Sequence, residues 1–213
     1  MNKLLICTIL SFIASNVQAQ SFEKVRAITV LVTNEGLGGS GRGTGVLLDA
    51  THVLTCAHMV SGQADMMLVY TYPMAHVYIA KPDAVDRSDD LAILVLDSSA
   101  PVKQAPVFYE NVPEGSPITI IGNVLGSMKW YVTHGVITGT DGPYLLTDGA
   151  ILPGNSGGPW VNEKGHIVAL TDWALHSSDG TATGINGGVS ATTINRFLEN
   201  YKMSSFLAKM LDN

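Results

Sequence analysis

Three short segments of the chain carry residues whose types suit acyl transfer. His58 ends one apolar run, Asp90 stands directly before another, and Ser156 lies between the glycines of Gly154–Pro159. A serine hydroxyl is a weak nucleophile at neutral pH, a histidine can accept and return its proton, and a carboxylate can fix the imidazole tautomer. The order His, Asp, Ser therefore indicates covalent catalysis at a hydroxyl.

Each of the first two segments alone has an ordinary structural explanation. A single histidine at the end of a strand is usually a half-buried side chain. The adjacent carboxylates of Asp89 and Asp90 could form a solvated acidic turn. The run around Ser156 is harder to explain as a plain turn, because its glycines let backbone N–H groups approach a bound atom. This run also lacks the lysine of a phosphate-binding loop.

Short apolar and β-branched runs, separated by turn residues, surround these segments. Runs of this kind predict a sandwich or barrel built from strands. The strands predicted in the first half are Ala27–Thr33, Thr44–Leu48, His52–Thr55, Met66–Tyr70, Val77–Ala80 and Leu91–Leu96. Those predicted in the second half are Pro117–Ile121, Trp130–Thr138, Tyr144–Thr147, Gly165–Asp172 and Gly184–Val189. Two successive β units are the simplest architecture.

Two further segments differ from the strands. Ser98–Pro117 holds four prolines and is predicted to cross the surface between the two units. After Val189 apolar residues recur at helical spacing, so we expect a helix from near Ser190 or Thr192 that packs on the second unit.

The chain resembles the trypsin-like serine proteases, and within them the bacterial HtrA-like branch. The first likeness rests on Gly41–Leu48, Thr55–His58, Ser88–Leu94 and Gly154–Pro159. The second rests on Ile121–Asn123, Gly135–Ile137 and Thr147–Ser156. The order of the three chemical residues also agrees with the order in that family.

The resemblance implies an all-β fold of two six-stranded antiparallel barrels with a C-terminal helix. The first barrel would span about residues 20–105, and the second barrel with the helix about residues 115–213. The cleft between them would join His58 and Asp90 to Ser156. The backbone N–H groups of Gly154 and Ser156 would form an oxyanion hole. Asp90 matches the family pattern, and Asp89 is the fallback.

The resemblance also implies a set of substrate-binding residues. Ala150 would lie at the base of the primary pocket, with Thr171, Asp172 and Trp173 along one wall and Gly187–Gly188 as part of another. An uncharged base predicts cleavage after small or medium apolar residues. Asp172 complicates this prediction, because a carboxylate inside the pocket would favour a basic side chain.

The N-terminus has the pattern of a secretory signal. One lysine precedes the apolar run Leu4–Ala14, and small residues precede a cleavage point that we place after Ala19. The alternative is an uncleaved anchor, which the short run disfavours. Residues 1–19 are therefore predicted to be a signal, and residues 20–213 an exported protease domain, periplasmic or secreted. The HtrA-like branch usually carries a peptide-binding PDZ domain, and none is expected here.

Composition excludes several classes of function. The net charge is −6 and charged residues make up 14% of the chain, so a basic stripe for nucleic acid is missing. Removal of the signal would leave Cys56 as the only cysteine, and the histidine spacing matches no helical zinc motif. We therefore expect no cofactor, no metal, no nucleic-acid partner and no stable membrane insertion of the mature chain.

These features together predict a serine endopeptidase that cuts protein or peptide substrates through an acyl-enzyme. Its activity should rise between about pH 6 and 8 as His58 loses its proton. Two alternatives remain open: a latent or non-catalytic binding protein on the same fold, and an esterase that uses the same triad. The natural substrate and the oligomeric state are also open.

Overall fold

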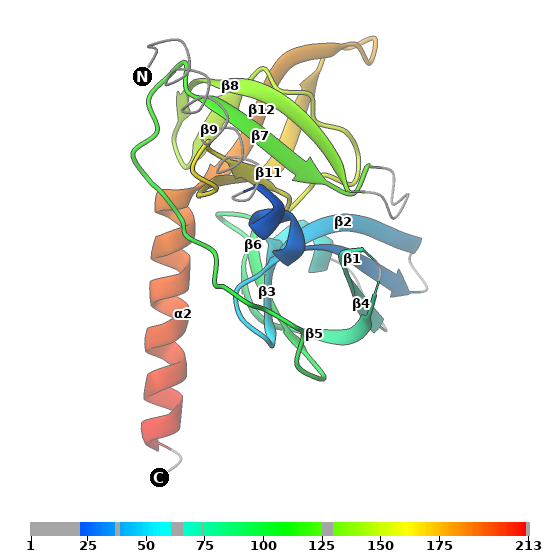
Figure 1. Cartoon of the computed structure of the whole chain (residues 1–213), viewed down its shortest axis with the longest axis vertical. Coiled ribbons are helices and arrows are strands. Elements are labelled where there is room, and N and C mark those ends of the chain that lie inside the picture. The colour runs from blue at the N-terminus through cyan, green and yellow to red at the C-terminus, as the bar shows by residue number, and fades with distance from the viewer. Residues whose placement is uncertain (1–21, 37–38, 61–65, 74, 125–129, 212–213) are drawn as a thin grey trace, which may run out of the picture.

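Two closed β-barrels make up most of the molecule in the computed structural model, which describes residues 22–36, 39–60, 66–73, 75–124 and 130–211 (Figure 1). The first barrel contains β1 (Thr29–Gly36), β2 (Gly39–Leu47), β3 (His52–Cys56), β4 (Met66–Thr71), β5 (Val77–Asp86) and β6 (Leu91–Leu96). The second contains β7 (Pro117–Gly122), β8 (Tyr131–Asp141), β9 (Tyr144–Thr147), β10 (Pro159–Val161), β11 (Ile167–His176) and β12 (Ala182–Ser190). The predicted fold class is confirmed, and the predicted signal lies outside the described residues.

The two barrels share one topology. The strand order around the first is β1-β2-β3-β6-β5-β4, and the second repeats it as β7-β8-β9-β12-β11-β10. Every pairing within the barrels is antiparallel. Closure leaves no free sheet edge, so the backbone groups along the strands are paired within each barrel.

The apolar core runs through both barrels. Leu54 and Ile93 fill the first barrel, while Trp160 and Val168 fill the second, and none of these four side chains is exposed. Residues of the second barrel, such as Ile121 and Leu170, belong to the same cluster as the core of the first. The barrels therefore pack on each other through apolar contacts, which hold any site at their junction in place.

The segment before β1 differs from the prediction. Residues 22–28 are helical, so the strand predicted over Ala27–Thr33 is wrong at its first two residues. Val25 and Ile28 bury the apolar face of this turn, and the Thr29 hydroxyl donates to the Val25 carbonyl at 2.9 Å. The sequence here fits both a helix, with apolar residues three apart at Val25 and Ile28, and the start of a strand. The segment forms the helix because this buries both side chains.

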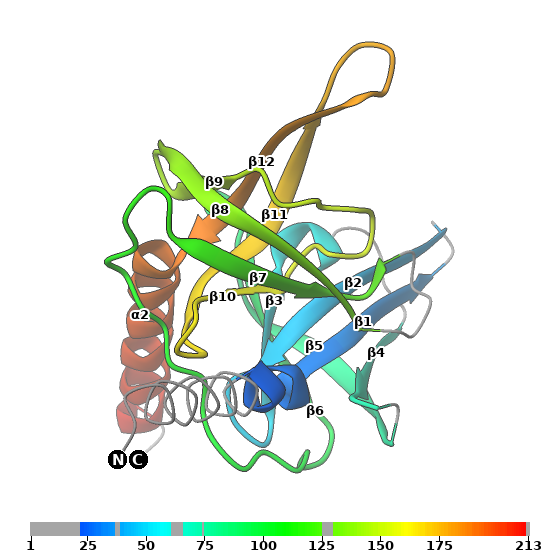
Figure 2. The ribbon, with the colours of Figure 1, turned by 45° about the horizontal axis from the view of Figure 1, so that its top comes forward.

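The segment between the barrels and the C-terminal helix agree with the predictions. Residues 97–116 have no strand or helix and run beside α2 (Ala191–Leu211) (Figure 2). The Ser190 hydroxyl accepts the Thr193 N–H at 3.3 Å and caps the helix. None of the described helices is long and apolar enough to cross a membrane.

Helix α2 contacts both barrels. Ile194 and Phe197 are buried in the shared core. On the side of the first barrel, Arg196 pairs with Asp89 at 2.7 Å. The Tyr201 hydroxyl donates to a carboxylate of β5 at 2.6 Å. The helix therefore connects the second barrel to the turn between β5 and β6.

Candidate active site

His58 lies in the 3-10 turn η1 (Ala57–Val60) that follows β3. Both carboxylate oxygens of Asp90 hold it. One accepts the ring N–H of His58 Nδ1 at 2.6 Å, and the other accepts the His58 backbone N–H at 2.8 Å. The Asp90 carbonyl accepts the N–H of Ala57 at 3.0 Å. Because 44% of the imidazole side chain is exposed, the ring is anchored on one edge and accessible on the other.

Asp90 adopts an unusual backbone conformation. It ends the turn between β5 and β6 with φ of 51°, which is left-handed and costs a non-glycine residue about 1–3 kcal/mol. Asp86 braces the start of this turn, because its carboxylate accepts the N–H and the hydroxyl of Ser88 at 2.9 and 2.6 Å. Asp89 points away to Arg196. Of the two candidate carboxylates, Asp90 is the one that contacts His58.

A second carboxyl group lies beside this pair. Asp172 Oδ1 is 4.0 Å from His58 Nδ1, and a carboxyl oxygen of Asp172 lies within 4.8 Å of one from Asp90. Only 11% of its side chain is exposed. We predicted that Asp172 lines the substrate pocket, and its carboxyl group lies beside the His58–Asp90 pair. Substrate binding by Asp172 stays a prediction.

The protonation equilibria of these groups depend on one another. The hydrogen bond to Asp90 raises the pKa of His58, and this effect outweighs burial, which lowers it. Burial raises the pKa of Asp90, but the hydrogen bonds from His58 and Asp172 outweigh it and leave that pKa below its usual range. Burial, followed by the hydrogen bond to Asp90, raises the pKa of Asp172 to about 7.

Ser156 lies on a loop shaped by two left-handed glycines. Asn155 N–H donates to the Leu152 carbonyl at 3.0 Å and closes a turn in which Gly154 has φ of 100°. A positive φ at the third residue defines a type II turn. Among the described residues, no group accepts the N–H of Gly154 or Ser156. Both donors therefore remain open to a bound oxygen.

Gly157 holds the other side of Ser156 at a close approach between the barrels. Its φ is 80°, and a Cβ at this position would collide with the carbonyl oxygen of Thr44 in β2. Only glycine fits both the conformation and the space. The backbone after Ser156 is therefore pressed against the first barrel.

Thr44 joins three segments at this junction, a role that sequence reasoning missed. Its N–H donates to the Ser156 carbonyl and its hydroxyl to the Gly154 carbonyl, both at 2.7 Å. The hydroxyl also accepts the N–H of Asn123 at 2.9 Å. Its position between two glycines, in a motif that we used only for the resemblance, was the one available signal.

One carbonyl oxygen brings the two halves of the site together. Thr171 O accepts the N–H of Gly157 at 2.8 Å and the thiol of Cys56 at 3.2 Å. Gly157 directly follows Ser156, and Cys56 is two residues before His58. The nucleophile loop and the histidine turn are therefore anchored at the same point of β11.

The other residues predicted to bind substrate lie on the second barrel. Ala150 is exposed, and its carbonyl accepts the Thr133 hydroxyl at 2.8 Å. Thr171 is fully buried, and its hydroxyl accepts the indole N–H of Trp160 at 2.9 Å. The Trp173 ring lies where a Cβ on Gly187 would be. Substrate binding at these positions stays a prediction.

His58 and three neighbouring side chains are of the types that bind zinc. Cys56, His58, Asp90 and Asp172 each place one donor atom within 4.8 Å of the others. Ligand atoms about 2.0 Å from a tetrahedral ion lie about 3.3 Å apart, whereas His58 Nδ1 and Asp90 Oδ2 are 2.6 Å apart. In the geometry described here, the histidine and aspartate form a hydrogen bond that a cation would have to break.

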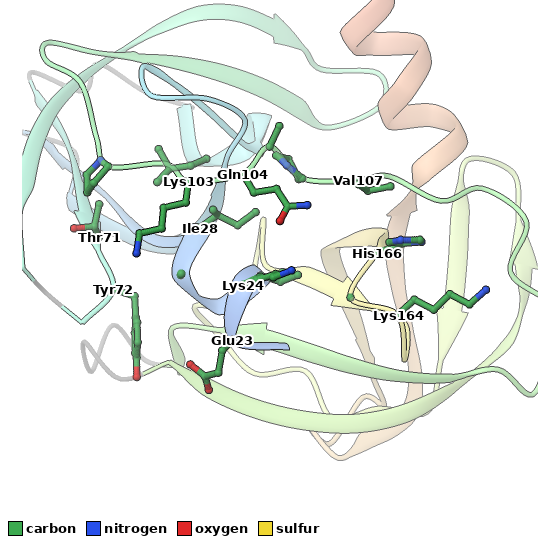
Figure 3. A pocket seen from close by; sticks show the side chains of 17 residues that line it. Glu23, Lys24, Ile28, Thr71, Tyr72, Lys103, Gln104, Val107, Lys164 and His166 are labelled. Atoms are coloured by element: carbon green, nitrogen blue, oxygen red, sulfur yellow. The ribbon is translucent and has the colours of Figure 1, made fainter. Parts of the chain in front are cut away.

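A cavity of about 820 Å³ lies elsewhere. Its lining includes residues 23–25, 27 and 28, the segment from Pro101 to Val107 and the β10–β11 turn. Figure 3 shows Lys24, Lys103 and Lys164 among its side chains. None of His58, Asp90 and Ser156 lines it. It is therefore separate from the candidate active site.

Comparison with known proteins agrees with this geometry. The model of the trypsin-like peptidase domain family matches residues 43–170. The chain is 29% identical over 184 residues to the serine protease Do-like HtrA of Bacillus subtilis, covering 78% of this chain and 40% of the relative. It is 28% identical over 169 residues to chloroplastic protease Do-like 1 of Arabidopsis thaliana, covering 72% and 38%.

Solved structures give the same result. The HtrA-type protease AlgW, solved with a tripeptide, has a TM-score of 0.75 at 25% identity and matches 85% of this chain and 62% of its own. The serine endoprotease of Yersinia pestis has a TM-score of 0.71 at 25% identity, with 86% and 65% covered. The chain belongs to the trypsin-like peptidase domain family and is similar to its HtrA-type members. It spans 38% to 42% of the length of the first curated relatives it matches.

Proposed function

We propose that this chain is an exported serine endopeptidase that hydrolyses peptide bonds with His58, Asp90 and Ser156. The proposal rests mainly on two hydrogen bonds that Asp90 accepts from His58, one from Nδ1 at 2.6 Å and one from the backbone N–H at 2.8 Å. They lie at the junction where the Ser156 loop meets the first barrel. This arrangement suits a base that must be fixed on one edge and exposed on the other. The family match and the HtrA-type relatives also support it.

In the proposed reaction, His58 removes the proton from Ser156 as its oxygen attacks the peptide carbonyl. Asp90 stabilises the imidazolium that forms, and His58 then returns the proton to the leaving amine, so an acyl-enzyme remains. Water, activated by the same histidine, releases the acid and regenerates the serine. The N–H groups of Gly154 and Ser156 bind the oxyanion, and each such donor contributes about 3 kcal/mol.

We further propose cleavage after small or medium apolar residues. The exposed Ala150 at the predicted pocket base supports this preference, as does the position of the Asp172 carboxyl group beside the His58–Asp90 pair. No other carboxylate was predicted along the pocket. A peptide library that strongly favours arginine or lysine before the cut would contradict this preference.

The test is labelling of the protein with a fluorophosphonate probe, with Ser156→Ala as the matched control. We expect a single adduct on Ser156 by mass spectrometry, none on the variant, and cleavage of casein by the wild type. Labelling of Ser156 together with hydrolysis of an ester substrate, but without cleavage of casein, would identify an esterase. Failure of labelling, in protein whose circular dichroism shows the native fold, would favour a latent or binding protein.

Export is part of the same proposal. The lysine and apolar run at the N-terminus support it, as residues 1–19 have the composition of a cleaved signal. Mass spectrometry of protein recovered from the periplasm or medium should give Gln20 as the first residue. We expect this form to be active without a further cut.

A further inference from the structure

Asp172 is the extra residue of a β-bulge. In the pairing of β11 with β12, Thr171 faces Gly188 and Trp173 faces Gly187, so Asp172 has no partner of its own. A bulge of this kind redirects the side chain of the unpaired residue. Here the carboxyl group is directed at the back of the His58–Asp90 pair.

The position of Asp172 favours a retained proton. One of its carboxyl oxygens lies within 4.8 Å of one from Asp90, and a protonated carboxyl group can donate to that carboxylate, whereas an ionised one only repels it. Two carboxylates that share a buried site do not both ionise readily, because their charges repel and neither is well solvated. Tyr144 acts in the opposite direction, because its interaction lowers the pKa of Asp172, but burial and Asp90 outweigh it.

We propose that Asp172 is a positioning residue of the active site, one that keeps a proton, donates it to Asp90, and thereby limits how strongly Asp90 retains a proton on His58. This inference rests on the proposed function. Asp172 contacts neither the nucleophile nor the substrate in the proposed reaction. It acts through Asp90.

The titratable groups around Asp172 support a shared proton. Cys56 and His58 face it from the first barrel, Asp90 faces it from the β5–β6 turn, and Tyr144 faces it from β9. Among these groups only His58 can become a cation. Burial and Asp90 raise the pKa of Asp172 to about 7, within the range in which His58 also titrates.

The consequence is a coupled titration of two sites. Below about pH 7 Asp172 is neutral, and Asp90 alone stabilises a protonated His58. Once Asp172 ionises, two negative charges face the imidazole and retain its last proton more strongly. The acid limb of the rate profile in the wild type should therefore be broader than a single ionisation.

The first test measures the carboxyl group directly. In Ser156→Ala protein, which keeps the network and cannot cut itself, carbon-13 NMR should show Asp172 titrating with a midpoint of about 7. A midpoint near the ordinary value of about 4 would overturn the proposal. This measurement needs no substitution of Asp172 and no enzymatic activity.

The second test measures the effect on His58. In the same Ser156→Ala background, Asp172→Asn should lower the midpoint of the His58 ring titration by roughly one pH unit. The matched control Asp89→Asn, a neighbouring carboxylate that pairs with Arg196, should leave that midpoint unchanged. Equal midpoints with and without Asp172 would overturn the proposal, even if Asp172→Asn lowered stability.

The two proposals fail in different ways. If the wild type does not react with the fluorophosphonate, the proposed function fails, while the two NMR titrations still decide whether Asp172 holds the proton and acts on His58. If the wild type is active but its acid limb is as narrow as that of Asp172→Asn, the positioning role fails and the proposed function stands.

Discussion

The two barrels have the same strand order but hold their parts of the site by different means. In the first barrel, the side chain of Asp90 holds His58 through both of its oxygens. In the second, Ser156 is held by backbone hydrogen bonds and by the left-handed glycines on either side of it. The base therefore depends on one carboxylate, whereas the nucleophile depends on the dihedral angles of glycines and on the space that they leave.

The largest effect should come from a methyl group at Gly157. Gly157→Ala combines a left-handed conformation, which costs about 1–2 kcal/mol, with a collision against the Thr44 carbonyl that adds about 1–3 kcal/mol. We expect loss of activity and a large fall in the urea midpoint. Gly180→Ala is the matched control, because its φ is 83° but a Cβ there meets nothing within 4 Å. Similar losses for both variants would contradict a role for close packing.

The next effect tests the first barrel. Asp90→Asn keeps the shape of the side chain but removes the charge that stabilises the imidazolium, so kcat/KM should fall by about 10⁴. The fold, followed by circular dichroism, should be retained. Asp89→Asn should change kcat/KM by less than about twofold, since this carboxylate faces α2. A large loss in Asp89→Asn would mean that the two carboxylates had been assigned the wrong roles.

An intermediate effect should come from Thr44, which joins the two barrels. Thr44→Val removes the hydroxyl that bonds to Gly154 and Asn123, and leaves those two groups buried. At about 1 kcal/mol for each bond, kcat/KM should fall by roughly tenfold or more. Thr44→Ser keeps the hydroxyl and should retain most of the activity. Equal activities of the valine and serine variants would show that the hydroxyl is dispensable.

The last prediction concerns stability as a function of pH. The pKa of Asp172 is about 7 in the folded protein, against about 4 unfolded, so the folded state binds more protons between these values. Its contribution to the free energy of unfolding therefore falls as pH rises from about 4 to 7. Asp172→Asn does not titrate, so its stability relative to wild type should rise over that interval. Urea denaturation at pH 5 and 8 measures the difference, and an unchanged difference would contradict the shared proton.

Much of this architecture could be predicted from the sequence. The strand runs and the apolar spacing after Val189 carry local information, which is why two β units and the C-terminal helix could be predicted. The two closed barrels and the pairing of His58 with Asp90 were implied by the family resemblance. The resemblance favoured Asp90 over the adjacent Asp89. The structure adds the physical reason, a left-handed turn at Asp90 that directs its carboxylate to the imidazole.

The direction of Asp172 could not be predicted, for a physical reason. Alternation along β11 is interrupted by a bulge, and the register shift that defines it depends on the partner strand β12. A one-residue shift moves a side chain from one face of a sheet to the other. The contacts of Thr44 were equally hidden, because its partners are far away in sequence.

The thiol of Cys56 offers a reporter of motion within the site. It is fully buried, its Sγ donates to the Thr171 carbonyl, and burial, with Asp90 and Asp172, raises its pKa well above the usual range. A thiol reagent can therefore react only when β3 separates from β11, the same separation that would detach the nucleophile loop from the histidine turn. The rate at which the Cys56 thiol is modified in the native protein therefore measures how often the interface between the barrels opens.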